Sequence, residues 1–404
     1  MSNSNWKKFP VLFSLYIAQS VPMSFFSTVV PVIMRQENYS LESIGLLQLV
    51  KLPWIIKFLW APLVDKTAGK ARHYKSWIII SELFYALIIV SIAFLDLQTD
   101  FRLIVVFMVV AFIASATQDI ATDAYAIMIL KKKERSIGNS MQSAGSFSGA
   151  LLGTGVLLIA YYYFGWRILL LLLAFFVVFA IIPLLLYRKD NNQRTARDTH
   201  QRVSLADIYR FFAIKGMHKR VLILVFYYSG IIGILAMLKP YMVDLGYTVK
   251  EIGFISGIIG TSVAALMAFL SGYIIKIAGR KFSIYLFAFI NFLAALYFVF
   301  ISTGTPGIVS LYAAICLVWG AYGLSTVIIY TTSMDVVRKG REGTDFTVQI
   351  VLTHLSGMII AIMSGKAGDA MGYTGLFGLE AALALFTLIL LLYAVPKNLG
   401  NGDI

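Results

Sequence analysis

The sequence predicts an all-α membrane protein of twelve transmembrane helices in two six-helix bundles. Of its 404 residues, 59% are hydrophobic and only 13% are charged, whereas a soluble domain is about 45 to 50% apolar and about 25% charged. The mean hydropathy is +0.81. A helix needs about 20 apolar residues to cross the hydrocarbon core of a bilayer, so the chain has room for roughly a dozen spans. This composition excludes a water-soluble globule.

Apolar stretches bounded by charged or turn residues define the twelve candidate helices. Helix is the expected conformation because in lipid each backbone polar group must be paired within its own segment. The stretches cover residues 10–34, 43–64, 76–95, 102–129, 136–163, 167–187, 219–241, 250–276, 281–302, 306–335, 346–370 and 374–395. No small-residue cleavage site follows the first stretch, so we expect it to be a retained span.

One long polar segment divides these stretches into two sets of six. We therefore predict an N-terminal bundle over residues 1–187, a cytoplasmic linker over 188–218 and a C-terminal bundle over 219–404. Of the 34 Lys and Arg residues, 26 fall in loops on one side, five lie on the other and three lie within spans. Because basic loops face the cytoplasm, we expect both termini there. The basic segment suits anionic lipid headgroups better than nucleic acid.

An internal repeat supports the division into halves. Tyr39–Gly45 recurs as Tyr247–Gly253, an offset of 208 residues, and 134–142 parallels 342–349 to within one residue. Either match alone is weak, but both agree with the break between the two sets of spans. We infer a duplication with parallel repeats, a plan found in secondary transporters that bind substrate between the halves near the membrane midplane.

The loop after the second span resembles the Gly-x-x-x-Asp-x-x-Gly-Arg motif of major facilitator transporters. Ala61 to Asp65 is followed by Gly69-Lys70, and a second, imperfect copy runs from Gly272 to Lys281. The resemblance implies the major facilitator fold and transport by alternating access. It also implies that Asp65 is a latch that meets helix ends or cations from the other half in one conformational state and releases them in the other. The alternative is an ordinary basic loop.

Three further segments are similar to the AmpG-related branch of that superfamily. They are the run from Ile44 to Asp65 with Pro53-Trp54, the run from Ser115 to Tyr125, and Gly138-Asn139-x-x-Gln142-x-x-Gly145. This branch contains the AmpG muropeptide permeases, siderophore permeases of the RhtX and FptX type, and acetyl-CoA transporters. AmpG permeases usually carry two extra spans, which this chain lacks. The resemblance therefore implies import of a ferric siderophore, with a muropeptide as the alternative.

Ionisable residues within spans need a reason, because a charge at the bilayer centre costs about 3 kcal/mol unless it is paired or hydrated. Asp119 and Asp123 are four residues apart, so they share one face of the fourth span. Lys57 lies at a similar depth in the second span, and we expect it to pair with Asp119. The cluster is a candidate proton-coupling or gating site, since neighbouring charges shift carboxylate protonation. The alternative is a static structural ion pair.

Other polar and aromatic residues in the spans are candidates for contact with substrate. Lys51 lies deep in the second span and suggests an anionic ligand, or else a lysine that reaches for the membrane surface. The tyrosines suit a bulky, partly flat solute, although each would also suit a packed core. His354 is a candidate proton carrier or a hydrogen-bonded structural residue. The substrate-binding candidates are Tyr16, Gln19, Lys51, Trp54, Gln118, Gln142, Tyr228, Tyr322 and Tyr330.

Glycines at small-x-x-x-small spacing are expected to allow close helix contact. In the implied fold the fifth and eighth spans meet across the halves, which predicts that these glycines form a seam there. They are Gly145, Gly149, Gly153, Gly253 and Gly257.

Nothing in the sequence resembles an enzyme or a cofactor site. There is no phosphate-binding Gly-Lys-Ser/Thr loop and no metalloprotease or nucleophile-elbow motif. The single cysteine, Cys316, allows no intramolecular disulfide and no thiolate metal site. We therefore expect a monomeric proton symporter of the cytoplasmic membrane that takes up a bulky anionic solute. Its partners would be the solute, protons and lipid, without nucleic acid, cofactor or metal. The rival interpretations are a uniporter and a non-transporting scaffold or sensor.

Overall fold

The computed structural model describes residues 6–36, 47–68, 70–187 and 203–396, and these residues are helical apart from short connections, without strands. Tyr39–Gly45, the first copy of the repeat, and residues 188–202 of the predicted linker lie outside the described residues. The structure divides into two compact units. Unit 1 contains Met1–Lys131, Gly145–Ile208 and Val337–Val348; unit 2 contains Lys132–Ala144, Tyr209–Val336 and Gln349–Ile404. The predicted domain boundaries at 187 and 219 stay predictions.

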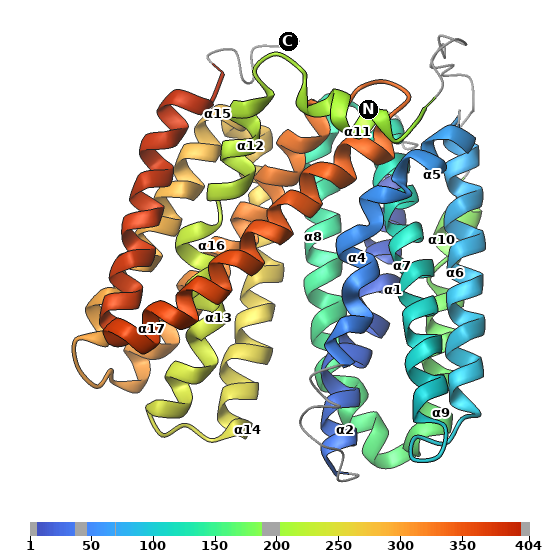
Figure 1. Cartoon of the computed structure of the whole chain (residues 1–404), viewed down its shortest axis with the longest axis horizontal. Helices are drawn as coiled ribbons and strands as arrows, with labels where there is room; N and C mark the ends of the chain where they lie inside the picture. Colours follow the sequence, from blue (N-terminus) through green and yellow to red (C-terminus); the bar gives the residue numbers. More distant parts are fainter. Residues whose placement is uncertain (1–5, 37–46, 69, 188–202, 397–404) are drawn as a thin grey trace. The chain divides into compact units, whose positions relative to one another are not determined.

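In Figure 1, unit 1 is built on a group of helices in which α1, α4 and α7 lie close together and α6 packs along α7 and α9. Its elements are α1 (Lys8–Ser24), η1 (Phe25–Val29), α2 (Val30–Gln36), η2 (Gln48–Lys51), α4 (Leu52–Ile56), η3 (Lys57–Leu59), α5 (Ala61–Thr67), α6 (Ala71–Ala93), α7 (Phe101–Ile129), η5 (Leu152–Val156), α9 (Leu157–Phe179), α10 (Ile182–Leu186) and the start of α11 (Ala206–Phe212), which continues into unit 2 after Ile208. Helix α8 (Arg135–Leu151) begins in unit 2 and ends in unit 1.

In unit 2, α13 packs on α15 and α16, and α15 packs along α16. The elements of this unit are η4 (Lys132–Glu134), α12 (Met217–Phe226), α13 (Ser229–Asp244), α14 (Val249–Ile252), η6 (Gly253–Gly260), α15 (Thr261–Ser302), α16 (Ile308–Asp335) and all of α17 (Glu342–Ala394) after its first two turns.

Eight segments of the described chain are long and apolar enough to cross a membrane. Three of them, with 53 to 55 residues each, turn back at Gly165, Gly279 and Gly372, where φ is 70°, 83° and 67°. Only glycine adopts such a φ readily, so each of these segments contains two predicted spans. The eight segments hold eleven of the twelve predicted spans, which confirms the predicted all-α membrane architecture.

The remaining span, the second, is not a regular helix in its described part. It runs through two short 3₁₀ turns, η2 and η3, and two short helices, α4 and α5. Pro53 and Pro62 each stand in the first turn of one of these helices, and proline supplies no N–H for a continuous helix. The break places Lys57 in the 3₁₀ turn between them.

The first span also departs from regular α-helix, after Ser24. The helix α1 continues through Pro22 to Ser24 and then widens into the π-helical turn η1. Such π-helical turns often occur at functional sites. The proline therefore changes the helical winding without ending the helix.

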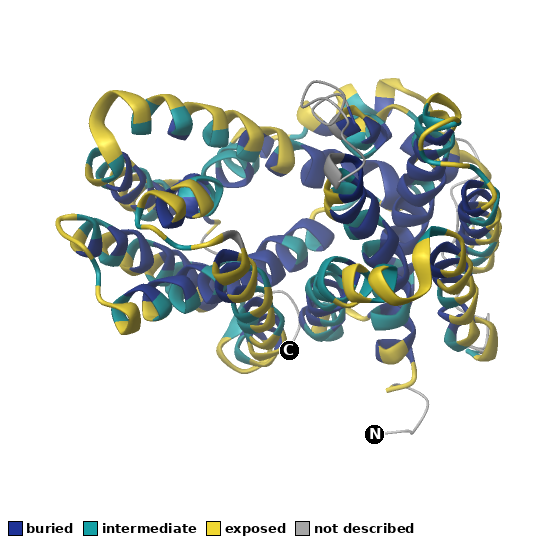
Figure 2. Cartoon of the chain, turned by 90° about the horizontal axis from the view of Figure 1, so that it is seen from below, coloured by how far each residue is buried: buried dark blue, intermediate teal, exposed yellow. Residues whose placement is uncertain are grey.

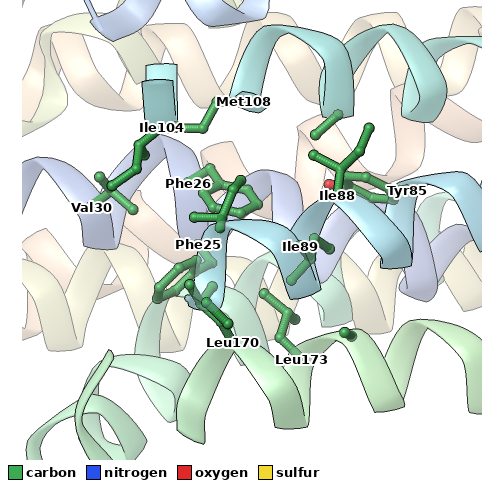
Figure 3. Close-up of a cluster of buried hydrophobic side chains, with 14 of the residues drawn as sticks. Phe25, Phe26, Val30, Tyr85, Ile88, Ile89, Ile104, Met108, Leu170 and Leu173 are labelled. Carbon is green, nitrogen blue, oxygen red and sulfur yellow. The ribbon is translucent and has the colours of Figure 1, made fainter. Parts of the chain in front are cut away.

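Unit 1 is held together by a hydrophobic cluster that joins several of its helical segments, among them η1, α6, α7 and α9 (Figure 3). Phe25 and Phe26 of η1, Ile89 of α6, Met108 of α7 and Leu170 of α9 are each fully buried. The outer faces of both units carry exposed residues, shown in yellow in Figure 2. Large apolar side chains on those faces suit contact with lipid, as exposed Ile80 and Leu87 of α6 illustrate.

Candidate functional site

The expected lysine–aspartate pair is present in the interior of unit 1. Lys57 Nζ forms an ion pair with Asp119 Oδ2, and the Gln19 amide donates to Asp119 Oδ1 at 2.8 Å. The exposed fractions are 1% for Lys57 and 4% for Asp119 and Gln19. Because the lysine neutralises the carboxylate in a low dielectric, removing either partner would leave an uncompensated charge.

Asp123 lies one helical turn further along α7 and takes a different partner. The Tyr16 hydroxyl of α1 donates to its Oδ1. Lys57 also lies over the ring of Trp54, 4.6 Å from the ring centroid, a cation–π arrangement. One cluster, referred to below as the acidic cluster, therefore brings together the predicted carboxylates and several predicted partners. Its members are Asp119, Asp123, Lys57, Tyr16, Gln19 and Trp54.

Asp65 accepts four hydrogen bonds, three of them from the first turn of α17. The backbone N–H of Gly343 donates to Oδ1 at 2.9 Å, while the N–H and hydroxyl of Thr344 donate to Oδ2 at 2.7 and 2.6 Å. The Tyr74 hydroxyl adds a bond of 2.6 Å. A carboxylate satisfies the unpaired N–H groups of a helix N-terminus and favours its dipole. Asp65 therefore meets a helix end that lies in the C-terminal half of the sequence, although the structure groups this helix end with unit 1, and its role as a latch stays a prediction.

Burial sets the protonation of this carboxyl group. Asp65 is 1% exposed, and desolvation raises its pKa to about 6, although the hydrogen bonds from Thr344, Tyr74 and Gly343 act in the opposite direction. Asp65 thus lies at the end of the second predicted span with a pKa close to neutral pH.

The same end of unit 1 contains an ion-pair network that the sequence analysis missed. Arg338 forms a hydrogen-bonded pair with Asp345 at 2.6 Å, and Arg341 Nε donates to Asp207 at 3.1 Å. The basic loop at 338–341 was visible in the sequence, but its acidic partners lie on other elements. The network fixes the segment that presents Gly343 and Thr344 to Asp65.

Unit 2 contains a pocket of about 350 Å³ lined by four of the predicted residues, Tyr228, Tyr322, Tyr330 and His354. The rings of Tyr228 and Tyr322 meet edge to face at 5.8 Å between centroids. Thr326 and Thr353 add hydroxyl groups to the wall. A pocket of aromatic faces and hydroxyl groups suits a solute that has both apolar and hydrogen-bonding surfaces.

A second network missed by the sequence analysis lies within unit 2. Asp335, at the end of α16, pairs with Arg135 at 2.9 Å and with Arg280. The Arg280 guanidinium also donates to the carbonyl of Lys132 at 2.6 Å. Arg280 belongs to the second motif copy, Gly279-Arg280-Lys281, and this motif was the sequence feature that could have indicated the network. Here the motif supplies the cation, whereas its first copy supplies the carboxylate Asp65.

Three of the predicted substrate-binding residues lie outside the acidic cluster and the pocket of unit 2. Lys51 is half-buried on η2, and no described residue forms an ion pair with it. Gln142, on the part of α8 that belongs to unit 2, is 5% exposed. Gln118 is fully buried on α7 but lies beside Glu82 of α6. Among the described residues no group of three or more His, Cys, Asp or Glu side chains is placed to hold a metal ion.

The predicted glycine seam is partly wrong. Gly145, Gly149 and Gly153 pack against the first span inside unit 1: a Cβ at Gly145 would lie 3.2 Å from Tyr16 Cβ, and one at Gly149 would lie 2.6 Å from Ser20 Cβ. Small residues permit this close approach. The glycines of the fifth span therefore bring α1, which carries Tyr16 and Gln19, close to the helix that begins at Arg135.

Comparison with known proteins gives one family match. The model of the Major Facilitator Superfamily matches residues 12–361. Similar curated proteins include the anhydromuropeptide permease of Escherichia coli strain K12, which is 23% identical over 95% of this chain and 78% of its own length. The putative transporter AmpG 3 of Rickettsia typhi is 26% identical over 83% of this chain and 84% of its own length.

Solved structures of similar fold are also transporters. A Major Facilitator Superfamily transporter, FucP, in the outward conformation is 16% identical, covers 98% of this chain and 100% of its own, and has a TM-score of 0.74. A bacterial homologue of the iron transporter ferroportin in an outward-facing state is 14% identical, covers 96% of this chain and 98% of its own, and has a TM-score of 0.70. At these identities the similarity establishes the fold alone, the one that the motifs implied.

Proposed function

The chain belongs to the Major Facilitator Superfamily, is a multi-pass membrane transporter of a small-molecule substrate, and we propose that it imports an anhydromuropeptide-type solute by proton symport. The observation that carries the coupling is the acidic cluster, in which Lys57, Asp119 and Asp123 are buried within membrane spans. Uncompensated charge there is costly, so a change of partner or of protonation would bias the conformation of the carrier. We place the protein in the cytoplasmic membrane with both termini on the cytoplasmic side.

The relatives support the muropeptide alternative over the ferric siderophore. The E. coli relative named anhydromuropeptide permease aligns with 95% of this chain. An anhydromuropeptide joins a sugar to a peptide with carboxylates, and the pocket of Tyr228, Tyr322, Tyr330 and His354 offers aromatic faces and polar atoms for such a ligand. We assign these residues to the sugar. Lys51 of unit 1, which has no described ion-pair partner, stays a separate candidate for an anionic ligand.

Within unit 1 we assign different roles to the two carboxylates. Asp119 is paired with Lys57 and Gln19. We assign it the role of a gate, in which the ion pair with Lys57 forms in one conformation of the carrier and breaks in the other. Asp123 accepts a hydrogen bond from the Tyr16 hydroxyl, and we assign proton coupling to it because it lies one helical turn from the Lys57–Asp119 pair. Asp65, at the N-terminus of α17, is the latch of the alternating-access cycle.

A thermal-shift screen of the purified protein tests the substrate class. A ligand that binds only the folded protein raises the apparent melting temperature. We expect a rise with anhydromuropeptides and none with ferric siderophores or acetyl-CoA. The variant Tyr228→Ala should abolish the rise, while Tyr241→Phe, outside the pocket, should keep it. A rise with the siderophores alone would overturn the assignment, and no rise with any solute would favour a scaffold or sensor.

A further inference from the structure

A second buried carboxyl group lies in unit 1, outside the acidic cluster. Glu82 stands in the middle of α6, is fully buried at 0% exposure, and neither of its carboxyl oxygens has a hydrogen-bond partner in the described part of the chain. An ionised carboxylate in such a place would cost several kcal/mol. Glu82 therefore requires an explanation that the proposed transport mechanism does not supply.

The neighbours of Glu82 are polar and equally buried. The helices α6 and α7 are joined by a short connection and run antiparallel, which sets Glu82 beside Gln118 and Tyr85 beside Ser115. Gln118 and Ser115 are 0% exposed and Tyr85 is 1% exposed. The polar atoms of these three side chains have no hydrogen-bond partner in the described chain either. They form a polar layer, defined as Glu82, Tyr85, Ser115 and Gln118.

This polar layer lies next to the hydrophobic cluster of unit 1. The ring of Tyr85 belongs to the hydrophobic cluster of unit 1 and packs beside Ile88 (Figure 3). Tyr85 lies near enough to Glu82 for the two groups to interact electrostatically. Among the described residues, the helices packed against α6, which include α7 and α9, bring no charged side chain to Glu82, so none of these residues is a cation that would neutralise an ionised Glu82.

Protonation of Glu82 would satisfy the hydrogen-bonding groups of both Glu82 and Gln118. An ionised carboxylate only accepts hydrogen bonds, so the Gln118 carbonyl oxygen beside it would keep no donor. A protonated carboxyl group donates its O–H to Gln118 Oε1 and accepts from Gln118 Nε2–H through its other oxygen. This two-bond pairing needs only side-chain rotation, because Gln118 already lies beside Glu82.

Unit 2 contains a neutral polar pair close to the positions that correspond to Glu82 and Gln118. The repeat offset of 208 residues carries Glu82 to Ile290 and Gln118 to Thr326, and the buried pair Asn291 and Ser325 lies one residue from each. Asn291 is 3% exposed, and its Oδ1 accepts from Ser325 Oγ at 3.0 Å while its Nδ2 donates to the Tyr227 carbonyl at 3.4 Å. A neutral group is thus fully accommodated between the equivalent helices of unit 2.

We propose that Glu82 and Gln118 form a proton-binding site inside unit 1, separate from the acidic cluster, in which Glu82 carries the proton and Gln118 holds it in place. Binding forms an O–H bond on one carboxyl oxygen of Glu82, and release leaves the carboxylate. The protonation is argued from the side chains alone. Only its participation in transport rests on the proposed proton symport.

Infrared spectroscopy of the full-length protein in lipid nanodiscs tests the site, because a protonated carboxyl group has its own C=O band. We expect this band at neutral pH in the wild type, its loss in Glu82→Gln and its retention in Glu380→Gln, which removes another carboxyl group that is 1% exposed. In Gln118→Leu, where Glu82 remains, the band should shift to the frequency of a free carboxyl group.

The outcomes separate this site from the proposed function. An unchanged spectrum in Glu82→Gln would show that Glu82 is ionised and would overturn the site. If that variant does not fold, an unshifted band in Gln118→Leu would overturn the pairing. The measurement needs neither solute nor a proton gradient. A Glu82 band without muropeptide binding would contradict only the substrate, whereas binding without the band would contradict only the Glu82 site.

Discussion

The interiors of the two units differ in charge although their helices repeat. In unit 1 the fourth span carries Asp119 and Asp123. The residues at the corresponding positions of unit 2, 208 residues further along the chain, are Val327 and Thr331. All four side chains are at most 4% exposed. The offset likewise replaces Lys57 by Ala265. A duplicated helical frame can therefore keep its packing while one copy retains the ionisable groups.

Unit 2 also contains an aromatic side chain where unit 1 contains a neutral partner of the acidic cluster. Gln19, which binds Asp119, corresponds to Tyr227, whose hydroxyl donates to the Ile284 carbonyl at 2.9 Å. Tyr227 also packs against Tyr228, a residue of the unit 2 pocket. This division suggests that unit 1 senses protons and unit 2 recognises the solute, and each prediction below tests it.

The largest effect is expected from Lys57→Met, which would leave Asp119 buried without its cation. Removing one partner of a buried ion pair costs about 3 to 5 kcal/mol, so the free energy of unfolding should fall by that amount. The double variant Lys57→Met with Asp119→Asn should regain most of the loss because no charge then remains. Denaturant unfolding in detergent measures both. A single variant as stable as the wild type would contradict a charged pair in unit 1.

The next effect is a pH dependence at Asp65. The pKa of this carboxyl is raised to about 6 in the folded protein and is about 3.9 in an unfolded chain, so the folded state binds more protons in between. The contribution of Asp65 to the free energy of unfolding should therefore be highest below about pH 4 and fall by at most about 3 kcal/mol as the pH rises through about 6.

Two variants identify the group that titrates. Asp65→Asn should be less stable throughout, because an amide N–H would face the donors of Thr344, but its contribution to the slope should vanish. Asp335→Asn in unit 2 breaks the pairs with Arg135 and Arg280 and leaves Asp65 intact, so the slope should persist. Thermal melting at a series of pH values measures this. A slope retained in Asp65→Asn would assign it to another group.

A smaller effect tests whether the two units share their packing. A Cβ at Gly149 would lie 2.6 Å from Ser20 Cβ in unit 1, and one at Gly323 would lie closer still to the Ala264 carbonyl oxygen in unit 2. Overpacking costs about 1 to 3 kcal/mol, so alanine at either position should destabilise the protein comparably. Gly155→Ala is the control, because no described atom lies within 4 Å of its Cβ. Unequal losses in the melting temperature would show that the units differ in packing as well.

The smallest effect is expected from Tyr228→Phe. Its hydroxyl donates a long hydrogen bond of 3.4 Å to the Ser325 carbonyl, and such a bond contributes about 0.5 to 1.5 kcal/mol. Stability should change little, while affinity for the solute should fall by up to about tenfold. Titration calorimetry measures the affinity. Tyr241 has a buried hydroxyl without a hydrogen-bond partner in the described chain, so Tyr241→Phe should bind the solute normally. An equal loss of affinity in both variants would show that the pocket does not bind the solute.

The sequence was sufficient for the features that have a local signal. Apolar length predicted the spans, and the four-residue spacing of Asp119 and Asp123 with the depth of Lys57 predicted the ion pair. The family motif implied the contact of Asp65, although its partners Gly343 and Thr344 lie 278 and 279 residues away.

Features set by the register between helices could not be predicted in this way. Glycine spacing indicated close packing, but the partner of Gly149 is the first span and not the eighth. Asp335 meets Arg135 across 200 residues and Arg280 across 55 residues. Glu82 becomes a neighbour of Gln118 only because the short connection fixes how α6 and α7 align. Such pairings depend on tertiary packing, which periodicity within one helix does not determine.

The most direct test of the division between the units is uptake of labelled anhydromuropeptide by protein reconstituted in liposomes, with and without an imposed proton gradient. The wild type should accumulate the solute only with the gradient. The double variant with Lys57→Met and Asp119→Asn, together with Asp123→Asn, should still bind the solute through the unit 2 pocket but should not accumulate it. Accumulation by this variant equal to that of the wild type would contradict the assignment of proton coupling to unit 1.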